Sequence, residues 1–430
     1  MTQKQTISPA GCVRGDIRVP GDKSISHRSI MIGALAEGRT RISGFLHGED
    51  NHATLNAFRA MGVPISEQDN GVLVIDGVGL DGLREPADVL DCGNSGTTMR
   101  LMTGLLSGQR FFSVLTGDQY LRRRPMRRVT EPLRAMGARI EGREGGDKAP
   151  LAITGGPLRS FHWDSPVASA QVKSALLLAG LYADGPVEVT EPHLSRDHSE
   201  RMLSHFGARI ERLPQGVRIE PRPRLVGGEI EIPGDISSAA FFMVAALIVP
   251  GSELLIRNVG INPTRSGVID ILRAMGGRIE LLDARERSGE PVADLLVRHS
   301  SLRGIDIGGE LVPRAIDEMP VVSVAAAFAE GTTRIRDARE LRVKETDRIA
   351  AMVCELGKLG ASVEALEDGM VIEGGRNLTG GDVDSHGDHR IAMSMAVAAL
   401  GAAGPVTIHD TGCTATSFPN FWPLLDSVVQ

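Results

Sequence analysis

The chain has 430 residues, 42% of them hydrophobic and 23% charged, which is the composition of a folded protein too long for one ordinary hydrophobic core. Its net charge is −7 and its aromatic content is 3%, which argues against a nucleic-acid binder, because such a protein needs a basic face or exposed aromatic rings. We therefore expect two domains and no nucleic-acid partner.

The apolar stretches and the cysteines indicate a cytoplasmic protein. Residues 1–18 lack the apolar run of a signal peptide, and the longest apolar stretch, residues 239–249, is too short to span a bilayer. We therefore expect no membrane partner. Because no two cysteines have Cys-x-x-Cys spacing, reduced and mostly buried thiols are expected rather than a zinc site or a disulfide framework. The cysteines are Cys12, Cys92, Cys354 and Cys413.

One pattern returns six times along the chain, at a period of roughly 70 residues. Each repeat opens at a turn bearing Gly, Ser or Asp and continues into a helix of small apolar residues. A β-branched strand, a second helix, a glycine and two more strands complete it. The openings are residues 21–24, 93–96, 169–171, 234–237, 317–320 and 387–390. Glycines that suit a left-handed residue after a helix end the second helices, at Gly62, Gly137, Gly207, Gly276 and Gly360.

The alternation of strands and helices predicts an α/β protein with parallel pairing inside each repeat. Six repeats divide evenly into three and three, with a boundary near Pro233-Gly234, where the periodicity is interrupted. Residues 6–19 precede the first repeat and are expected to close the last one. The expected domains are therefore residues 21–233 and a discontinuous domain of residues 1–20 and 234–430.

The opening helices of the repeats are apolar on nearly every face, so they should be buried, with their N-termini meeting at one end of each domain. Such helix ends attract phosphate and carboxylate groups. Cationic and small polar residues occupy these positions, namely Lys23, Ser24, Arg28, Asn94, Gly96, Arg100, Ser169, Gln171, Lys173, Asp317 and Arg390, and a polar run follows at residues 344–348.

Each of these features has a simpler interpretation when taken alone. A Lys-Ser pair after Gly-Asp is more often a helix cap than a ligand, and the arginine-rich run at 122–128 is more often a solvated patch. The stretch at 94–98 lacks the Lys-Ser/Thr ending of a nucleotide-binding P-loop. His27, His198 and His389 stand singly, so metal binding is not expected of them. The recurrence of similar residues in the same phase of several repeats favours an anion site.

Six motifs along the chain resemble those of the 5-enolpyruvylshikimate-3-phosphate synthase family, and the resemblance extends from end to end. The motifs occupy residues 21–28, 93–100, 124–126, 169–173, 344–348 and 388–390. The resemblance implies two similar domains, each of three βαβαββ repeats with buried helices, an inside-out α/β barrel with the active site in the cleft between the domains. It implies transfer of the enolpyruvyl group of phosphoenolpyruvate to the 5-hydroxyl of shikimate 3-phosphate. It also implies no cofactor or metal, and we expect a monomer.

The resemblance assigns roles by motif. Shikimate 3-phosphate would be bound by Lys23, Ser24, Arg28, Ser169, Gln171, Ser195, Arg196, Asp317 and Lys344. Phosphoenolpyruvate would be bound by Lys23, Asn94, Gly96, Arg124, Gln171, Arg348 and Arg390. Asp317 would take the proton of the 5-hydroxyl, with Lys23 and Glu345 acting at the methylene carbon of the donor. Two carboxylates and a lysine can carry out these proton transfers. Arginine suits two polyanionic substrates because its planar guanidinium donates paired hydrogen bonds to carboxylate and phosphate groups.

The sequence departs from the family pattern at one position, where Thr416 stands in place of a lysine that many relatives carry. Four short patterns, at 21–23, 169–173, 196–200 and 262–265, together with Leu101, resemble glyphosate-tolerant members, whereas Gly96 leaves space for that inhibitor. Intermediate tolerance is expected.

Two other functions are less consistent with the sequence. The first is an enolpyruvyl transferase that acts on UDP-N-acetylglucosamine, which would need a cysteine in the 122–128 region, where none occurs. The second is a non-catalytic polyanion-binding or RNA-end-processing protein built on similar repeats. The acidic net charge and the scarcity of aromatic residues argue against it.

Overall fold

The computed structural model describes residues 3–69 and 71–430, which form two compact units. Unit 2 comprises Gly21–Ile232 and Glu286–Glu290, and unit 1 comprises the remaining described residues up to Pro20, Pro233–Arg285 and Pro291–Gln430. The expected ranges, 21–233 and 1–20 with 234–430, differ from these units at Pro233, which belongs to unit 1, and at Glu286–Glu290. Residues Glu286–Glu290 form the tip of a hairpin and pack within unit 2, where His198 lies 2.7 Å from Glu290.

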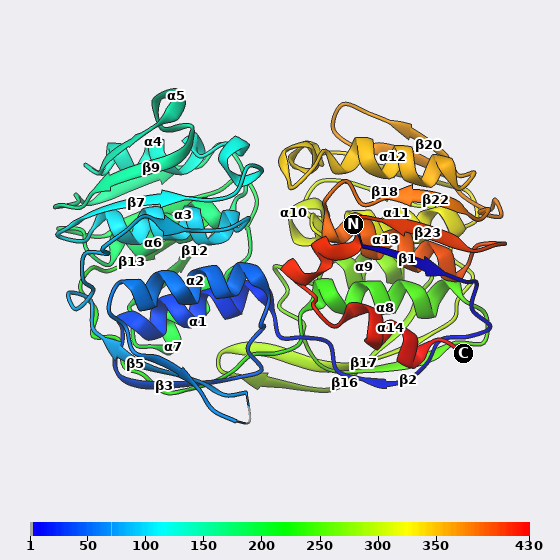
Figure 1. The fold of residues 1–430 in the computed structure, drawn as a ribbon, viewed down its shortest axis with the longest axis horizontal. Helices are drawn as coiled ribbons and strands as arrows, with labels where there is room; N and C mark the ends of the chain where they lie inside the picture. The colour runs from blue at the N-terminus through cyan, green and yellow to red at the C-terminus, as the bar shows by residue number, and fades with distance from the viewer. Residues whose placement is uncertain (1–2, 70) are drawn as a thin grey trace. The chain divides into compact units, whose positions relative to one another are not determined.

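Six helices open the repeats, and each is buried along almost its whole length. Every residue of the last of them, from His389 to Leu400, is buried, because alanine, methionine and leucine cover all of its faces. The predicted burial of the opening helices is confirmed, and Figure 1 shows them within their units. Unit 2 contains α1 (Lys23–Leu35), α3 (Gly96–Ser107) and α6 (Ala170–Gly180), and unit 1 contains α8 (Ile236–Ile248), α11 (Met319–Phe328) and α13 (His389–Leu400).

The second helix of each repeat is amphipathic and covers the outside of its unit. Gly62 and Gly276, with φ of 87° and 95°, follow two of these helices in the left-handed conformation that the sequence predicts for them. The second helices are α2 (Glu49–Ala60), α4 (Arg127–Ala135), α7 (His198–His205), α9 (Gly267–Ala274), α12 (Arg348–Lys358) and α14 (Phe421–Val428). Short helical segments are α5 (Arg143–Gly146), α10 (Leu311–Ala315), η1 (Leu121–Arg123), η2 (Arg339–Val343) and η3 (Thr411–Thr416).

Each repeat has its own small mixed sheet, in which one strand pair is parallel and the others are antiparallel. In unit 2 the strand orders are β14-β3-β5-β4, β6-β7-β9-β8 and β10-β11-β13-β12. The strands are β3 (Glu37–Ser43), β4 (Ile65–Glu67), β5 (Leu73–Val78), β6 (Leu90–Asp91), β7 (Phe112–Thr116), β8 (Arg139–Gly142), β9 (Lys148–Thr154), β10 (Phe161–Asp164), β11 (Val187–Thr190), β12 (Ile210–Leu213), β13 (Gly216–Ile219) and β14 (Glu229–Glu231).

In unit 1 the N-terminal segment contributes to two different sheets. β1 (Lys4–Ile7) pairs antiparallel with β23 and closes the sixth sheet, whereas β2 (Arg14–Ile17) pairs parallel with β15 in the fourth. The expectation that residues 6–19 close the last repeat is therefore confirmed for β1 and wrong for β2. The strand orders are β16-β17-β15-β2, β18-β19-β21-β20 and β1-β23-β22. The other strands are β15 (Glu253–Gly260), β16 (Arg278–Arg287), β17 (Glu290–Arg298), β18 (Asp306–Ile307), β19 (Thr332–Ile335), β20 (Ser362–Ala365), β21 (Met370–Glu373), β22 (Gly381–Asp384) and β23 (Val406–His409).

Close packing of the opening helices depends on their small residues. α3 meets α6 at Gly104, where a Cβ atom would lie 2.1 Å from the carbonyl oxygen of Ala175. Each unit has a continuous hydrophobic core built around its three opening helices. Among the described residues, no helix is both long and apolar enough to cross a membrane.

A buried polar network joins α1, α2 and α3 of unit 2. The Nδ1 atom of His27 lies 2.7 Å from the hydroxyl of Thr54, which in turn lies 2.7 Å from the hydroxyl of Thr98. Burial, assisted by the charges of Lys23 and Arg28, holds the pKa of His27 well below its ordinary value of 6.5.

The lowered pKa of His27 predicts a loss of stability in mild acid. The unfolded chain binds the proton more readily, so the contribution is full above pH 6.5 and is lost as the pH falls from there toward the lowered pKa. We expect the His27→Gln variant to lack this component, which amounts to up to about 1.4 kcal/mol per pH unit. Urea unfolding of both proteins between neutral pH and the lowered pKa measures it, and parallel pH curves would contradict the expectation.

Candidate active site

The predicted site residues fall into two groups, one on each unit. Members of each group lie at or just before the starts of the opening helices, as the helix-dipole argument requires, and Arg348 begins the second helix α12. The unit 2 group is Lys23, Ser24, Arg28, Asn94, Gly96, Arg124, Ser169, Gln171, Ser195 and Arg196, and the unit 1 group is Asp317, Lys344, Glu345, Arg348 and Arg390.

Lys23 is the first residue of α1, directly after its capping residue Asp22, whose carboxylate accepts from the backbone N–H of Ile25. The Lys23 ammonium lies 2.5 Å from the carboxylate of Asp50 at the start of α2, and its side chain is 16% exposed. The ammonium is therefore held at the surface end of α1 and remains partly accessible to an anion.

Arg28 lies one turn further along α1 and is almost fully buried. Its guanidinium donates to the carbonyl oxygen of Ser24 and, at 2.7 Å each, to the hydroxyls of Ser199 and Ser174. These partners come from α1, α7 and α6. The arrangement fixes the guanidinium between three helices of unit 2.

A second set of predicted residues surrounds the start of α3. Gln171 donates to the hydroxyl of Thr97 at 3.0 Å and accepts from Arg100 at 2.6 Å. Arg124 donates to the carbonyl oxygen of Asn94 at 3.4 Å. The backbone of Gly96 lies directly under these guanidinium groups, since a Cβ there would be 2.9 Å from Nη1 of Arg100 and 3.1 Å from Nη2 of Arg124.

A buried carboxylate positions the two predicted serine ligands. Glu191 accepts from the backbone N–H of Ser169 at 2.9 Å, from the backbone N–H of Ser195 at 3.1 Å and from the Ser195 hydroxyl at 2.7 Å. Lys173 neutralises it at 3.0 Å, reaches Glu200 at 2.8 Å and donates to the carbonyl oxygen of Ser195. Burial alone would lower the pKa of Lys173, but the two carboxylates raise it above its ordinary value, so the ammonium stays charged.

In unit 1 a single buried guanidinium organises the predicted residues. Arg348 starts α12, is 1% exposed, and donates to Asp388 at 2.8 Å, to Glu345 at 2.6 Å and to Asp317 at 3.4 Å. Burial opposes its charge, but the carboxylates of Asp388, Glu345 and Asp317 together raise its pKa above the ordinary range. Arg348 therefore fixes the positions of both predicted catalytic carboxylates.

Asp317 and Arg390 complete this group. The ammonium of Lys344 lies 3.2 Å from the same carboxylate oxygen of Asp317 that Arg348 contacts. Arg390, at the start of α13, donates to the Asp317 carbonyl oxygen at 3.0 Å and lies 3.9 Å from Glu318. Three cations thus surround Asp317, and two of them meet its carboxylate.

Four residues outside the predicted site list hold the predicted ones in place. Arg100 orients Gln171, Glu191 and Lys173 orient the two serines, and Asp388 both caps α13 and accepts from Arg348. Arg100, Lys173 and Asp388 lie inside recognised motifs, which was the available signal. Glu191 lies in no motif and was not predicted. Thr416 ends η3 and is partly buried.

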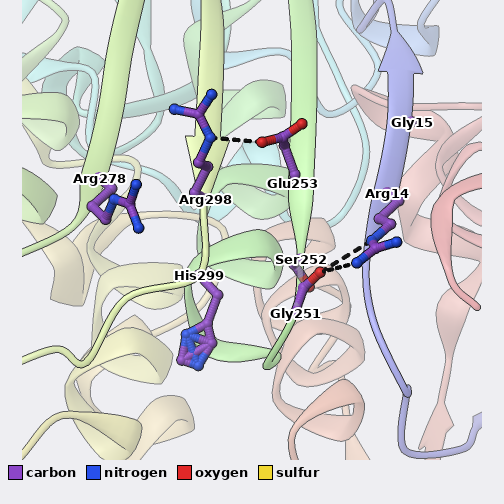
Figure 2. Close-up of a pocket in the computed structure, with 8 residues that line it drawn as sticks. All are labelled: Arg14, Gly15, Gly251, Ser252, Glu253, Arg278, Arg298 and His299. Carbon is purple, nitrogen blue, oxygen red and sulfur yellow. Dashed lines mark hydrogen bonds and ion pairs between the residues drawn. The ribbon is translucent and has the colours of Figure 1, made fainter.

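A hollow of about 650 Å³ on unit 1 is lined by none of the predicted residues (Figure 2). Arg14 donates there to the carbonyl oxygen of Gly251, and Arg298 donates to Glu253. Both arginines are therefore already engaged by the protein itself. The lining residues are Arg14, Gly15, Gly251, Ser252, Glu253, Arg278, Arg298 and His299.

The fold places the chain among the enolpyruvyl transferases. The solved enolpyruvyl transferase NikO from Streptomyces tendae matches it with a TM-score of 0.80, covering 100% of this chain and 98% of that one, at 17% identity, which speaks for the fold alone. The EPSP synthase of Acinetobacter baumannii matches with a TM-score of 0.89 at 49% identity, over 100% of this chain and 98% of that one.

Sequence relatives define the family within that class. The family model described as EPSP synthase (3-phosphoshikimate 1-carboxyvinyltransferase) matches residues 7–425. A 3-phosphoshikimate 1-carboxyvinyltransferase of Syntrophotalea carbinolica is 67% identical over 100% of this chain and 99% of that protein, and one of Geotalea uraniireducens is 69% identical over 99% of both. The chain belongs to the EPSP synthase family, so the predicted resemblance and the predicted fold class are confirmed.

Proposed function

We propose that this enzyme transfers the enolpyruvyl group of phosphoenolpyruvate to the 5-hydroxyl of shikimate 3-phosphate and releases phosphate. The observation that carries the proposal is the full-length membership of a family described by that transferase activity. The charge distribution supports it, because cations stand at the helix N-termini of both units, where polyanionic substrates are stabilised.

In unit 2, Lys23, Ser24, Arg28, Ser169, Gln171, Ser195 and Arg196 would bind shikimate 3-phosphate, joined by Asp317 and Lys344 of unit 1. The pairing of Ser169 and Ser195 on Glu191 supports this, because it presents two hydroxyl-bearing residues from one rigid support. Phosphoenolpyruvate would be bound by Lys23, Asn94, Gly96, Arg124, Gln171, Arg348 and Arg390.

The reaction needs two opposite proton transfers. In the addition step, Asp317 takes the proton of the 5-hydroxyl as its oxygen bonds to the substituted donor carbon, and Lys23 or Glu345 gives a proton to the methylene carbon. The product is a tetrahedral adduct. In the elimination step the roles reverse: Lys23 or Glu345 takes a proton back from the new methyl group, the double bond re-forms, and phosphate departs with the proton that Asp317 had taken. Lys344 and Arg348 hold the Asp317 carboxylate at 3.2 and 3.4 Å, and Arg348 holds the Glu345 carboxylate at 2.6 Å, so both groups are kept in fixed positions for these transfers.

Acceptor choice tests the proposal against the alternative transferase. The purified protein should release phosphate from phosphoenolpyruvate when shikimate 3-phosphate is added and should give only background release with UDP-N-acetylglucosamine. The reverse preference would overturn the proposed acceptor and leave the enolpyruvyl transferase fold intact. We further propose that the enzyme is a cytoplasmic monomer, which sedimentation equilibrium would check.

Gly96→Ala should weaken the binding of glyphosate more than the binding of phosphoenolpyruvate. The inhibitor is the longer molecule, so the added methyl group would intrude on it first. The structure adds a second effect, since the new Cβ would lie 3.1 Å from Nη2 of Arg124 and would push that guanidinium by a few tenths of an ångström. Some loss of phosphoenolpyruvate affinity is therefore expected too. Both dissociation constants should be measured in both proteins, and an equal factor for the two ligands would refute the steric argument.

A further inference from the structure

Three metal-ligand types converge on unit 1, outside the proposed active site. Cys354 and Glu355 are consecutive residues of α12, and His386 lies in the turn between β22 and α13. The thiol sulfur, a carboxylate oxygen and an imidazole nitrogen all lie within 4.8 Å of one another. Within residues 3–69 and 71–430, no other group of three His, Cys, Asp or Glu side chains brings its ligand atoms this close together.

The three ligand types match a borderline divalent cation. Zn²⁺ binds thiolate at about 2.3 Å and imidazole or carboxylate at about 2.0–2.2 Å, which separates ligand atoms by about 3.5 Å in a tetrahedron. The Nε2 atom of His386 lies 2.7 Å from Oε1 of Glu355, so an entering ion needs these two side chains to part by under an ångström. Because Cys354 and His386 are exposed and Glu355 is buried, the ion would enter from solvent against a fixed carboxylate.

The ammonium of Lys358 already lies beside the carboxylate that would bind the metal ion. The Lys358 ammonium contacts both oxygens of Glu355, at 3.0 and 2.8 Å. Its side chain is 44% exposed and lies one turn along α12, so it can move into solvent at small cost. The surroundings therefore accept positive charge beside Glu355, and Lys358 is the competitor that a metal ion must displace.

The supporting shell orients the ligands. The backbone N–H of Asp384 donates to Glu355 at 2.9 Å, and the Asp384 carboxylate accepts from the backbone N–H of His386 at 2.6 Å. His386 is held at a φ of 54°, a left-handed conformation that is uncommon for a residue other than glycine. A backbone outlier that places an imidazole on a buried carboxylate is a feature often found at functional sites.

We propose that Cys354, Glu355 and His386 form a binding site for one zinc-type divalent cation, with water as the fourth ligand. The bound ion would tie α12 to the turn that precedes α13. Arg348 and Arg390 lie at the N-termini of these two helices. The bound ion would therefore stabilise the two helices whose N-termini carry the proposed donor-binding arginines.

Cobalt(II) is the direct probe, because a thiolate ligand gives a charge-transfer absorption that carboxylate and imidazole ligands do not. Titration of the full-length protein should give this band, saturating at one equivalent. Cys354→Ser should abolish the band, and His386→Asn should weaken binding by about tenfold or more. Zn²⁺ should compete for the same site and raise the melting temperature of the wild type but not of Cys354→Ser.

Two matched variants make the experiment decisive. Lys358→Gln should bind cobalt several-fold more tightly than the wild type, because it removes the competing ammonium. Cys12→Ser removes another partly accessible thiol and should leave the band unchanged. A band that is absent from the wild type, or that persists in Cys354→Ser, would overturn the proposal, as would a band lost in Cys12→Ser.

Discussion

Asp317→Ala should lower turnover by about 10²-fold or more, the usual scale for losing a general base. Asp317 is the proposed acceptor of the 5-hydroxyl proton, and Lys344 and Arg348 hold its carboxylate at 3.2 and 3.4 Å. Removing it leaves Arg348 with Asp388 and Glu345 as partners, so the fold of unit 1 should survive. Substrate affinity should change far less than turnover, as steady-state kinetics with both substrates would show.

A conservative variant distinguishes a role of Asp317 in proton transfer from a role in positioning Lys344 and Arg348. Asp317→Asn keeps the volume and an oxygen that accepts from Lys344 and Arg348, but an amide cannot take a proton at neutral pH. We expect turnover as low as that of the alanine variant, with an unchanged melting temperature. Near-native turnover in Asp317→Asn would remove proton transfer from the role of this residue and leave only positioning.

The repeats could be predicted because local sequence determines them strongly. The opening helices have small apolar residues on every face, which only a buried helix tolerates, and glycines such as Gly62 and Gly276 mark the ends of the second helices. The destination of the N-terminal strands could not be predicted fully. β1 and β2 belong to different sheets of unit 1, and a four-residue strand carries no signal for its partner. The hairpin tip at Glu286–Glu290 shows the same limit.

The site could be predicted at the helix starts but not in the groups that support them. Lys23 and Gln171 lie at the starts of opening helices of unit 2, and Arg390 lies at the start of one in unit 1, so their positions follow from the repeat. Glu191 contacts Ser169 from 22 residues away along the chain and Ser195 from 4, and neither spacing corresponds to a recognised motif. Such contacts arise from the packing of loops, which periodicity does not encode.

The same limit applies to the proposed cation site of unit 1. Glu355 lies 31 residues before His386 in the chain, and its neighbour Cys354 belongs to no Cys-x-x-Cys motif. Spacing rules detect ligands that share one loop or one helix face. Ligands brought together by a helix and a distant turn become visible only in the folded chain.

Glu191→Gln should raise the Michaelis constant for shikimate 3-phosphate by about tenfold or more, the scale of losing a charge-assisted hydrogen bond or two. The carboxylate accepts from both backbone N–H groups of Ser169 and Ser195 and from the Ser195 hydroxyl. A glutamine has one oxygen to offer, and its NH₂ group would face donors. The two proposed ligand residues would then lose their common support.

Glu200→Gln is the matched control for this experiment. Glu200 pairs with the same ammonium, Lys173 at 2.8 Å, and is buried like Glu191, so both variants should lower the free energy of unfolding because each weakens a buried ion pair. Among the described residues, Glu200 makes no hydrogen bond to Ser169 or Ser195. The Michaelis constant for shikimate 3-phosphate should therefore rise in Glu191→Gln and stay near the wild-type value in Glu200→Gln. Equal increases would mean that the network acts through stability alone.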